Sequence, residues 1–300
     1  MDSGFDAVSL ALFTTLAPAG VVAFIALAAA RLFVRRDAQA KAAGAEGSED
    51  APPPVAVRLD RMMALPFSVV LIGFIASATH LGTPANALHV FSGIGRSPLS
   101  NEVLSAVAFL FLVGSYWMVA FKERFPDALA KPWLILASAA GIAFVACTSL
   151  AYGVSTVPTW DTWFTPANLC LSALLAGPVL GMLFLSLARA GGFRAHTALL
   201  AVAAAGLIAG TVVLALHNAS LGGIANNEIT AASLVPDYET AIATHAVLGA
   251  AGLLCGAISL RRGFPPSMAT ALRLAASLLV LAAVFATRII FYELHLTVGF

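Results

Sequence analysis

Long apolar segments dominate the pattern of this chain. Eight of them are separated by clusters of Pro, Gly and charged residues, and they cover residues 6–30, 62–80, 102–121, 131–153, 164–188, 196–218, 239–260 and 268–292. A helix of about 20 apolar residues can cross the hydrocarbon core of a bilayer. Barrel strands are shorter and alternate, and a lone strand would leave its backbone groups unpaired in lipid. The pattern predicts an all-α integral membrane protein, a bundle of eight transmembrane helices.

The basic residues predict how this bundle is oriented. Thirteen of the 16 lysines and arginines lie on the first, third, fifth and seventh loops, whereas the even-numbered loops hold only Arg96. Loops rich in Lys and Arg stay in the cytoplasm. We therefore expect both the N-terminus and the C-terminus to be extracytoplasmic, in the cytoplasmic (inner) membrane of a prokaryote. No basic segment precedes the first apolar run, so we expect that run to remain as a helix.

The chain is expected to form one transmembrane domain over 1–300, with two possible four-helix halves at 1–153 and 154–300. The segment 37–57 is rich in Ala, Gly, Glu and Pro, which predicts a flexible cytoplasmic loop. A weak internal repeat agrees with the two halves, because His80-Leu81-Gly82 ends the second apolar segment and His217 with Leu221-Gly222 ends the sixth.

Composition narrows the classes of function. Hydrophobic residues make up 60% of the chain and charged residues 10%, so lipid must solvate most of its surface. A net charge of +1 offers no field for nucleic acid. The cysteines Cys147, Cys170 and Cys255 stand singly in apolar runs, which is not the pattern of a metal or iron–sulfur site. Any iron–sulfur cluster is expected in another subunit.

A histidine and a glutamate stand at neighbouring helix ends. His80 closes the second apolar segment and Glu102 opens the third. Local chemistry offers a simple explanation, since Gly82 can cap the helix, His80 is favourable near a helix C-terminus and Glu102 in a first turn. Alternatively, a neutral imidazole and a carboxylate near membrane depth can accept the two protons that leave a quinol on oxidation.

The last apolar segment places three polar side chains on one helical face. Arg288, Tyr292 and His295 follow one another at intervals of four and three residues, toward the expected outer surface. Arg288 could reach a lipid phosphate, or it could pair with Glu102 or a quinone carbonyl. Tyr292 and Trp160 could belong to an interfacial aromatic belt, or could close a pocket over an apolar ring.

Haem ligation needs two facing histidines. Four histidines could lie on the outer side, namely His80, His217, His245 and His295. Most of them stand at helix ends beside Pro or Gly, so we expect no haem in this chain.

Several motifs, taken together, resemble the membrane anchor subunit of the dimethyl sulfoxide reductase family. They occur in the family's order over nearly the whole chain: His80-Leu81-Gly82 with Pro84, Leu99-Ser100-Asn101-Glu102, Thr156-Val157-Pro158-Thr159-Trp160 with Thr165-Pro166, Leu234-Val235-Pro236-Asp237-Tyr238, and Phe291-Tyr292 with His295 and Thr297-Val298-Gly299. The first loop departs from the family, being longer and acidic.

The resemblance implies a haem-free anchor of anaerobic respiration that binds menaquinol. It further implies a four-cluster ferredoxin-like iron–sulfur partner and a molybdopterin catalytic subunit that reduces S-oxides or N-oxides, both on the extracytoplasmic face. The family places the histidine and the glutamate of its motifs at the quinol site, which are His80 and Glu102 here. Arg288 and His295 match its C-terminal motif.

These inferences combine into one hypothesis with two rivals. Quinol would enter from lipid between the second, third and eighth helices, with His80 and Glu102 as the catalytic proton acceptors. The other expected quinol-binding residues are Asn101, Trp160, Arg288, Tyr292 and His295. The rivals are a secondary transporter, since intramembrane polar groups also mark substrate paths, and a haem-b cytochrome anchor.

Overall fold

A computed structural model describes residues 3–34, 53–79, 84–122 and 126–297, and most of them are helical. The α-helices are α1 (Ser3–Phe33), α3 (Val55–Met62), α4 (Ala64–Ala78), α5 (Pro98–Lys122), α6 (Asp127–Ala151), α7 (Phe164–Leu187), α8 (Phe193–Ser220), α9 (Tyr238–Ile258) and α10 (Pro266–Glu293). Short 3₁₀ helices are η1 (Pro84–Gly93), η2 (Leu221–Gly223) and η3 (Ala231–Leu234).

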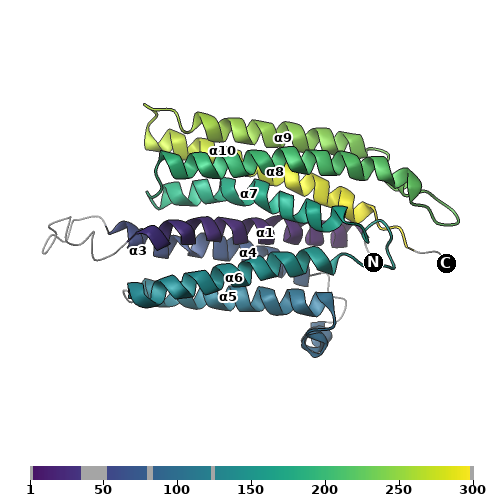
Figure 1. Ribbon diagram of the computed structural model, residues 1–300, viewed down its shortest axis with the longest axis horizontal. Helices are drawn as coiled ribbons and strands as arrows, with labels where there is room; N and C mark the ends of the chain where they lie inside the picture. Colours follow the sequence, from purple (N-terminus) through teal and green to yellow (C-terminus); the bar gives the residue numbers. More distant parts are fainter. Residues whose placement is uncertain (1–2, 35–52, 80–83, 123–125, 298–300) are drawn as a thin grey trace, which may run out of the picture.

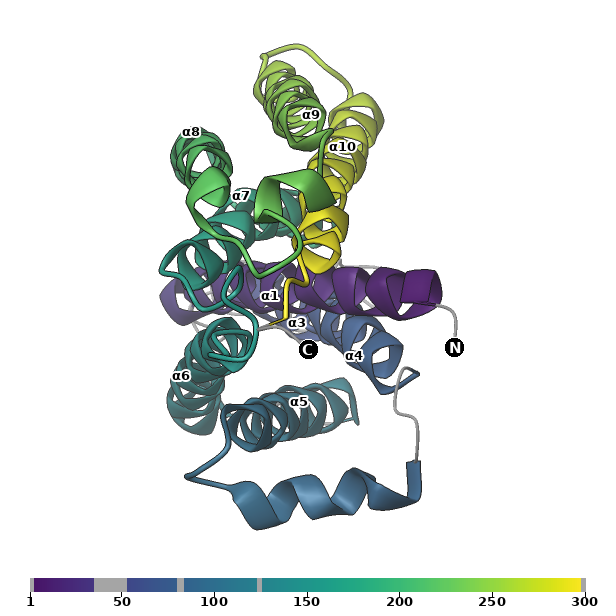
Figure 2. The ribbon, with the colours of Figure 1, turned by 90° about the vertical axis from the view of Figure 1, so that its right-hand side faces the viewer.

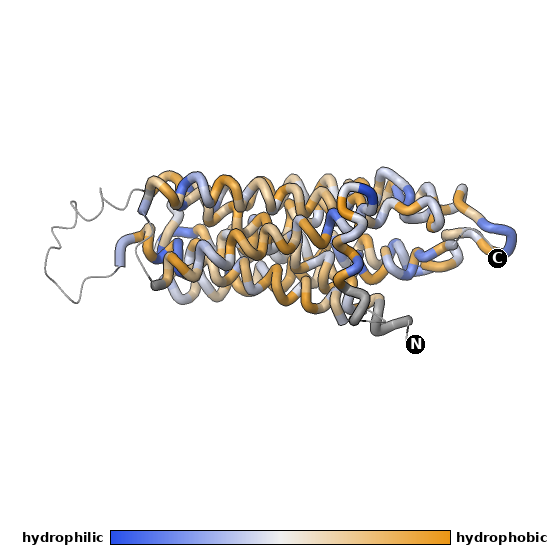
Figure 3. Tube along the Cα trace, turned by 90° about the horizontal axis from the view of Figure 1, so that it is seen from below, coloured by the Kyte–Doolittle hydropathy of each residue, from blue (hydrophilic) through white to orange (hydrophobic). Residues whose placement is uncertain are grey.

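Within the described ranges, eight spans are long and apolar enough to cross a membrane, with α3 and α4 together forming the second. The prediction of an all-α bundle with eight transmembrane helices is therefore confirmed, and the chain is a multi-span membrane protein. The helices run alongside one another, and α1 begins at the same end of the bundle where α10 ends (Figure 1). Hydrophobic residues line their length and hydrophilic residues gather toward the two ends (Figure 3).

α1 lies at the centre of the molecule (Figure 2). It packs against α4 and α6 on one side and against α7 and α10 on the other. Glycine permits the closest of these approaches, because a Cβ added at Gly177 of α7 would lie 2.3 Å from the Cβ of Val22 on α1. Phe24 of α1 and Phe109 of α5 meet edge to face, with ring centroids 5.4 Å apart. Small residues thus let the backbones approach, as is usual between membrane helices.

One buried ion pair joins α1 to α3. The Nε of Arg31 donates to Oδ1 of Asp60 at 2.9 Å, and the Tyr116 hydroxyl donates to the same oxygen at 2.6 Å. The Arg31 and Asp60 side chains have no solvent exposure. Because α3 begins at Val55, residues 55–57 are helical rather than part of the expected loop, and the rest of that loop up to residue 52 lies outside the described residues. The helix can begin there because Pro54 has an extended backbone and precedes it.

Candidate functional site

A cavity of about 170 Å³ opens beside the first turns of α5, near the end of the bundle that holds both chain ends. Its walls come from α1, α4, α5 and the end of α6: Leu10, Phe13, Phe74, Ser77, Leu99, Glu102, Val103, Ala151 and Tyr152. Most of these side chains are apolar. A dry cavity of about 150 Å³ in another protein holds a benzene ring, so this one has room for an aromatic ring.

Among the described residues that line this cavity, Glu102 is the only acidic one. It is 4% exposed, and its Oε1 has no hydrogen-bond partner among the described residues. The Thr148 hydroxyl interacts with the carboxyl group but is outside hydrogen-bond geometry. Buried polar atoms are normally paired, so a buried carboxyl oxygen left open beside a cavity indicates a site for a ligand that donates a hydrogen bond.

The turn before α5 fixes the position of Glu102. Oδ1 of Asn101 accepts a hydrogen bond from the backbone N–H of Gly95 at 2.8 Å, and Gly95 has a positive φ of 79° that suits glycine. Asn101 therefore holds the turn, and it is not among the residues that line the cavity. Its expected role as a direct quinol ligand finds no support in this geometry.

His80 lies outside the described residues. The helix that it was expected to close, α4, ends at Ala78, and Phe74 and Ser77 near that end line the Glu102 cavity.

Two tyrosines lie between the cavity and the interior of the bundle. Tyr152 lines the cavity, and its ring centroid is 5.7 Å from that of Tyr292 on α10. The Tyr292 hydroxyl donates to Oγ1 of Thr14 at 3.4 Å. Burial raises the pKa of Tyr152 well above its usual value, and Tyr292 and Glu102 add to this rise, so its hydroxyl stays protonated and can donate.

Trp160 packs and hydrogen-bonds against the end of α10. Its Nε1–H donates to the Phe291 carbonyl at 2.9 Å, and its ring stacks on Phe291 with centroids 5.0 Å apart. The exposed ring of His295 packs against the same indole at 4.9 Å. The preceding residue, Thr159, hydrogen-bonds the Leu294 carbonyl. Trp160 and His295 therefore cover the Tyr292 end of the site and are not lining residues of the Glu102 cavity.

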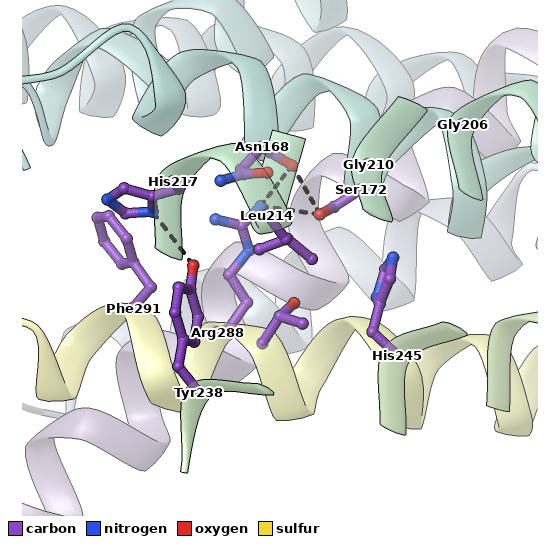
Figure 4. Close-up of a pocket in the computed structure, with 11 residues that line it drawn as sticks. Asn168, Ser172, Gly206, Gly210, Leu214, His217, Tyr238, His245, Arg288 and Phe291 are labelled. Carbon is purple, nitrogen blue, oxygen red and sulfur yellow. Dashed lines mark hydrogen bonds between the residues drawn. The ribbon is translucent and has the colours of Figure 1, made fainter. Parts of the chain in front are cut away.

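Arg288 occupies a second polar cluster, between α7, α8, α9 and α10 (Figure 4). It is 3% exposed, and one guanidinium nitrogen donates to the Asn168 carbonyl at 2.9 Å and to Oγ of Ser172 at 3.0 Å. Arg288 therefore does not extend to a lipid phosphate. Nor does it pair with Glu102 in the described part of the chain, where the ion pair found is that of Arg31 with Asp60. Tyr152 and Tyr292 interact electrostatically with both Glu102 and Arg288.

Two buried histidines face the same small cavity as Arg288. Nδ1 of His217 is 3.1 Å from the Tyr238 hydroxyl, and Nδ1 of His245 is 3.3 Å from the Ala283 carbonyl. Nε2 of each ring and Nε of Arg288 have no hydrogen-bond partner among the described residues. The cavity measures about 10 Å³, which accommodates about one water molecule.

The sequence pattern pointed to Glu102 but missed the residues around it. Tyr152 was missed because a single tyrosine one residue beyond an apolar helix resembles an interfacial belt residue. The residues that surround Arg288 are spread over four helices, so no local spacing joins them: Asn168, Ser172, His217, Tyr238 and His245. Four of them share the signal of a polar residue within a long apolar run, whereas Tyr238 comes just before the segment 239–260.

The described part of the structure has eight membrane spans and a buried carboxyl group beside an apolar cavity. The class of protein is therefore a helical membrane protein with an internal polar site. The chain belongs to the DMSO reductase anchor subunit family (DmsC), whose model matches residues 1–294. Membership makes it a membrane anchor subunit of a dimethyl sulfoxide reductase complex, and implies partnership with the catalytic and iron–sulfur subunits of such a complex.

Three related proteins support this family assignment. The protein is 36% identical over 242 residues to the anaerobic dimethyl sulfoxide reductase subunit YnfH of Escherichia coli, covering 81% of its own length and 84% of the relative. It is 37% identical over 229 residues to the C subunit of the anaerobic dimethyl sulfoxide reductase of the same organism, covering 76% and 79%. The corresponding C subunit from Haemophilus influenzae is 29% identical over 242 residues, covering 80% and 83%.

Proposed function

We propose that this anchor subunit oxidises menaquinol in the cavity beside Glu102 and passes the electrons to an iron–sulfur partner. The observation that carries the proposal is the open Oε1 of Glu102, buried at the wall of an apolar cavity that can hold an aromatic ring. A quinol is an aromatic ring with two hydroxyl donors, so it matches both the shape and the unused acceptor.

Oxidation of a quinol releases two protons and two electrons. Glu102 accepts one proton from a ring hydroxyl, and His80, which follows the α4 end that lines the cavity, accepts the other. The Tyr152 hydroxyl donates a hydrogen bond to the ring oxygen as negative charge develops there. Both electrons leave to the iron–sulfur subunit, and both protons leave toward the outer side of the membrane.

The route into the cavity is proposed to start in the lipid. Leu99, which lines the cavity, is 57% exposed, and Leu104 on the same helix is 39% exposed. In a membrane these apolar surfaces face acyl chains, so a quinol could reach Glu102 without crossing water.

The electron partners follow from the family. The proposed complex contains a ferredoxin-like iron–sulfur subunit with four clusters and a molybdopterin subunit that reduces the terminal acceptor. Both would lie on the extracytoplasmic face of the inner membrane, at the end of the bundle nearer the Glu102 cavity. This placement keeps the distance from quinol to the first cluster short.

The test measures quinol oxidation by the assembled complex in membranes. Glu102→Gln removes the proton acceptor with little change in shape, and we expect a loss of about 100-fold or more, the usual contribution of a general base. His80→Ala is expected to lose activity similarly. The matched control is Glu239→Gln, which removes an exposed carboxylate from the first turn of α9. Wild-type rates in both Glu102→Gln and His80→Ala would refute the proposal.

A further inference from the structure

The end of the bundle opposite the Glu102 cavity contains a basic cleft of about 880 Å³. It lies between the last residues of α7 and α9 and the first residues of α8 and α10. Its basic lining residues are Arg189, His196, Arg262 and Arg273, and no acidic side chain lines it within the described ranges. Three arginines, with no carboxylate among the described lining residues, give the cleft a positive potential that favours an anion.

Hydrogen bonds to two serines hold the guanidinium group of Arg273 in place in the cleft. Nε of Arg273 donates to Oγ of Ser259 at 3.1 Å, and Nη1 donates to Oγ of Ser186. These bonds fix the guanidinium before any ligand arrives. Both serines line the cleft themselves, so hydroxyl groups stand beside the charge.

A buried histidine also lines this cleft. His196 is 5% exposed, its Nδ1 lies 3.1 Å from the Gly192 carbonyl, and its Nε2 has no hydrogen-bond partner among the described residues. The imidazole thus adds a polar group to the arginines and serines that line the cleft.

The helix ends at the cleft also favour an anion. α8 begins at Phe193 and α10 at Pro266, so both direct the positive ends of their dipoles to it. The negative ends of α7 and α9 already receive cations, because Nε of Arg58 donates to the Ala188 carbonyl at 2.8 Å and Nη2 of Arg273 donates to the Ser259 carbonyl at 3.5 Å.

Apolar surface adjoins the charged groups. Phe193 at the cleft is 66% exposed, and on α10 Leu274 and Leu278, which follow Arg273, are 48% and 60% exposed. Residues 274 and 278 stand one above the other on the helix surface. A ligand with an anionic head and apolar chains would therefore cover both the arginines and this strip.

From these features we infer that the cleft binds the phosphate head group of an anionic phospholipid, with its acyl chains along the exposed side of α10. Basic pockets between membrane helices on the cytoplasmic side are suited to such head groups. The basic end of this bundle is the one expected in the cytoplasm. The lipid would tie the ends of α7, α8, α9 and α10 together, and the inference does not depend on quinol oxidation at the other end.

The experiment compares two pairs of exposed arginines in the full-length chain, purified in detergent. Arg189→Gln with Arg262→Gln removes two cleft charges, whereas Arg194→Gln with Arg261→Gln removes two neighbouring charges that do not line the cleft. The probe is phosphatidylglycerol, with phosphatidylethanolamine and inorganic phosphate as comparisons. Binding is followed by native mass spectrometry and by the rise in unfolding temperature on titration.

We expect phosphatidylglycerol to bind the cleft pair about 30-fold more weakly than wild type, from roughly fivefold lost for each arginine. The control pair should stay near wild type, and higher salt should weaken wild-type binding. Equal losses in both pairs would overturn the inference, because general surface charge would then explain them. Equal binding of phosphatidylethanolamine, or full competition by millimolar inorganic phosphate, would also overturn it.

Discussion

At the scale of single residues, two buried carboxyl groups of this chain differ in their hydrogen-bond partners. Asp60 receives hydrogen bonds from Arg31 and Tyr116, so its charge is compensated inside the protein. Glu102 is almost as buried, yet its Oε1 has no such partner in the described part of the chain. A satisfied carboxylate holds structure, whereas an open one at a cavity wall is available for proton transfer.

The Asp60 pair makes a prediction about stability. Arg31→Met removes the Arg31 cation from the buried Asp60 carboxylate, and we expect a loss of about 3–5 kcal/mol in the free energy of unfolding. Arg31→Met combined with Asp60→Leu removes both charges and should recover most of that loss. Unfolding of both variants in detergent measures the difference. A double variant no more stable than the single one would show that the lost charge pairing is not the cause.

The Tyr152 hydroxyl makes a prediction about turnover. Tyr152→Phe keeps the ring that packs on Tyr292 but removes the donor, so we expect quinol oxidation to fall about tenfold, the value of one hydrogen bond of about 1.4 kcal/mol in the transition state. Tyr238→Phe is the control, because the Tyr238 hydroxyl hydrogen-bonds His217 in the other polar cluster. Rates and KM are measured in assembled membranes. An unchanged rate in Tyr152→Phe would remove this residue from the site.

The candidate site was predictable from the sequence only where local pattern carried it. Glu102 stood out because it is a carboxyl group close to the expected start of an apolar helix and belongs to a recognised motif. The structure places it beyond the first turn, since α5 begins four residues earlier, at Pro98. The position of Arg288 away from Glu102 was not predictable, since it depends on hydrogen bonds to α7 residues more than a hundred positions earlier in the chain. The helix period predicts which face of a helix a residue occupies, but it does not predict which residue of another helix lies opposite.

At the scale of elements, the hydrophobic pattern predicted the long helices well. The expected segment 164–188 corresponds to α7 at Phe164–Leu187, and 239–260 corresponds to α9 at Tyr238–Ile258. The membrane explains this success, because backbone groups in lipid must pair within their own helix. The pattern missed α3 and η1, which are short and lie at the polar ends of the bundle. Water can hydrogen-bond to the backbone there, so the hydrophobic pattern no longer predicts whether a segment is helical.

The contact between α1 and α7 makes a prediction about packing. Gly177→Ala adds a methyl group against Val22 and within 3.0 Å of the Ala19 carbonyl, so we expect the unfolding temperature to fall, with a cost of about 1–3 kcal/mol. Gly222→Ala is the matched control, because a Cβ there meets nothing within 4 Å. Thermal unfolding in detergent compares the two. If both variants unfold like wild type, the helices can separate without penalty and the close approach is not needed.

At the scale of the whole molecule, the two ends of the bundle have different chemistry. One end holds the Glu102 cavity, with the start of α1 and the end of α10 close by (Figure 1). The other end holds the buried Arg31–Asp60 pair and the cleft with Arg189 and Arg262. Because basic loops are retained in the cytoplasm, this asymmetry predicts the direction in which the protein is inserted.

The last prediction concerns this orientation. In a background with Cys147, Cys170 and Cys255 replaced by Ala, Glu228→Cys should react with a membrane-impermeant maleimide in right-side-out vesicles, whereas Arg261→Cys should react only in inside-out vesicles. Both positions are exposed in loops at opposite ends of the bundle. Detergent-solubilised samples control for reactivity, since both cysteines should then label equally. The reverse pattern would place the Glu102 cavity near the cytoplasm, so protons from quinol would leave inward and the iron–sulfur partner would have to be sought on that side.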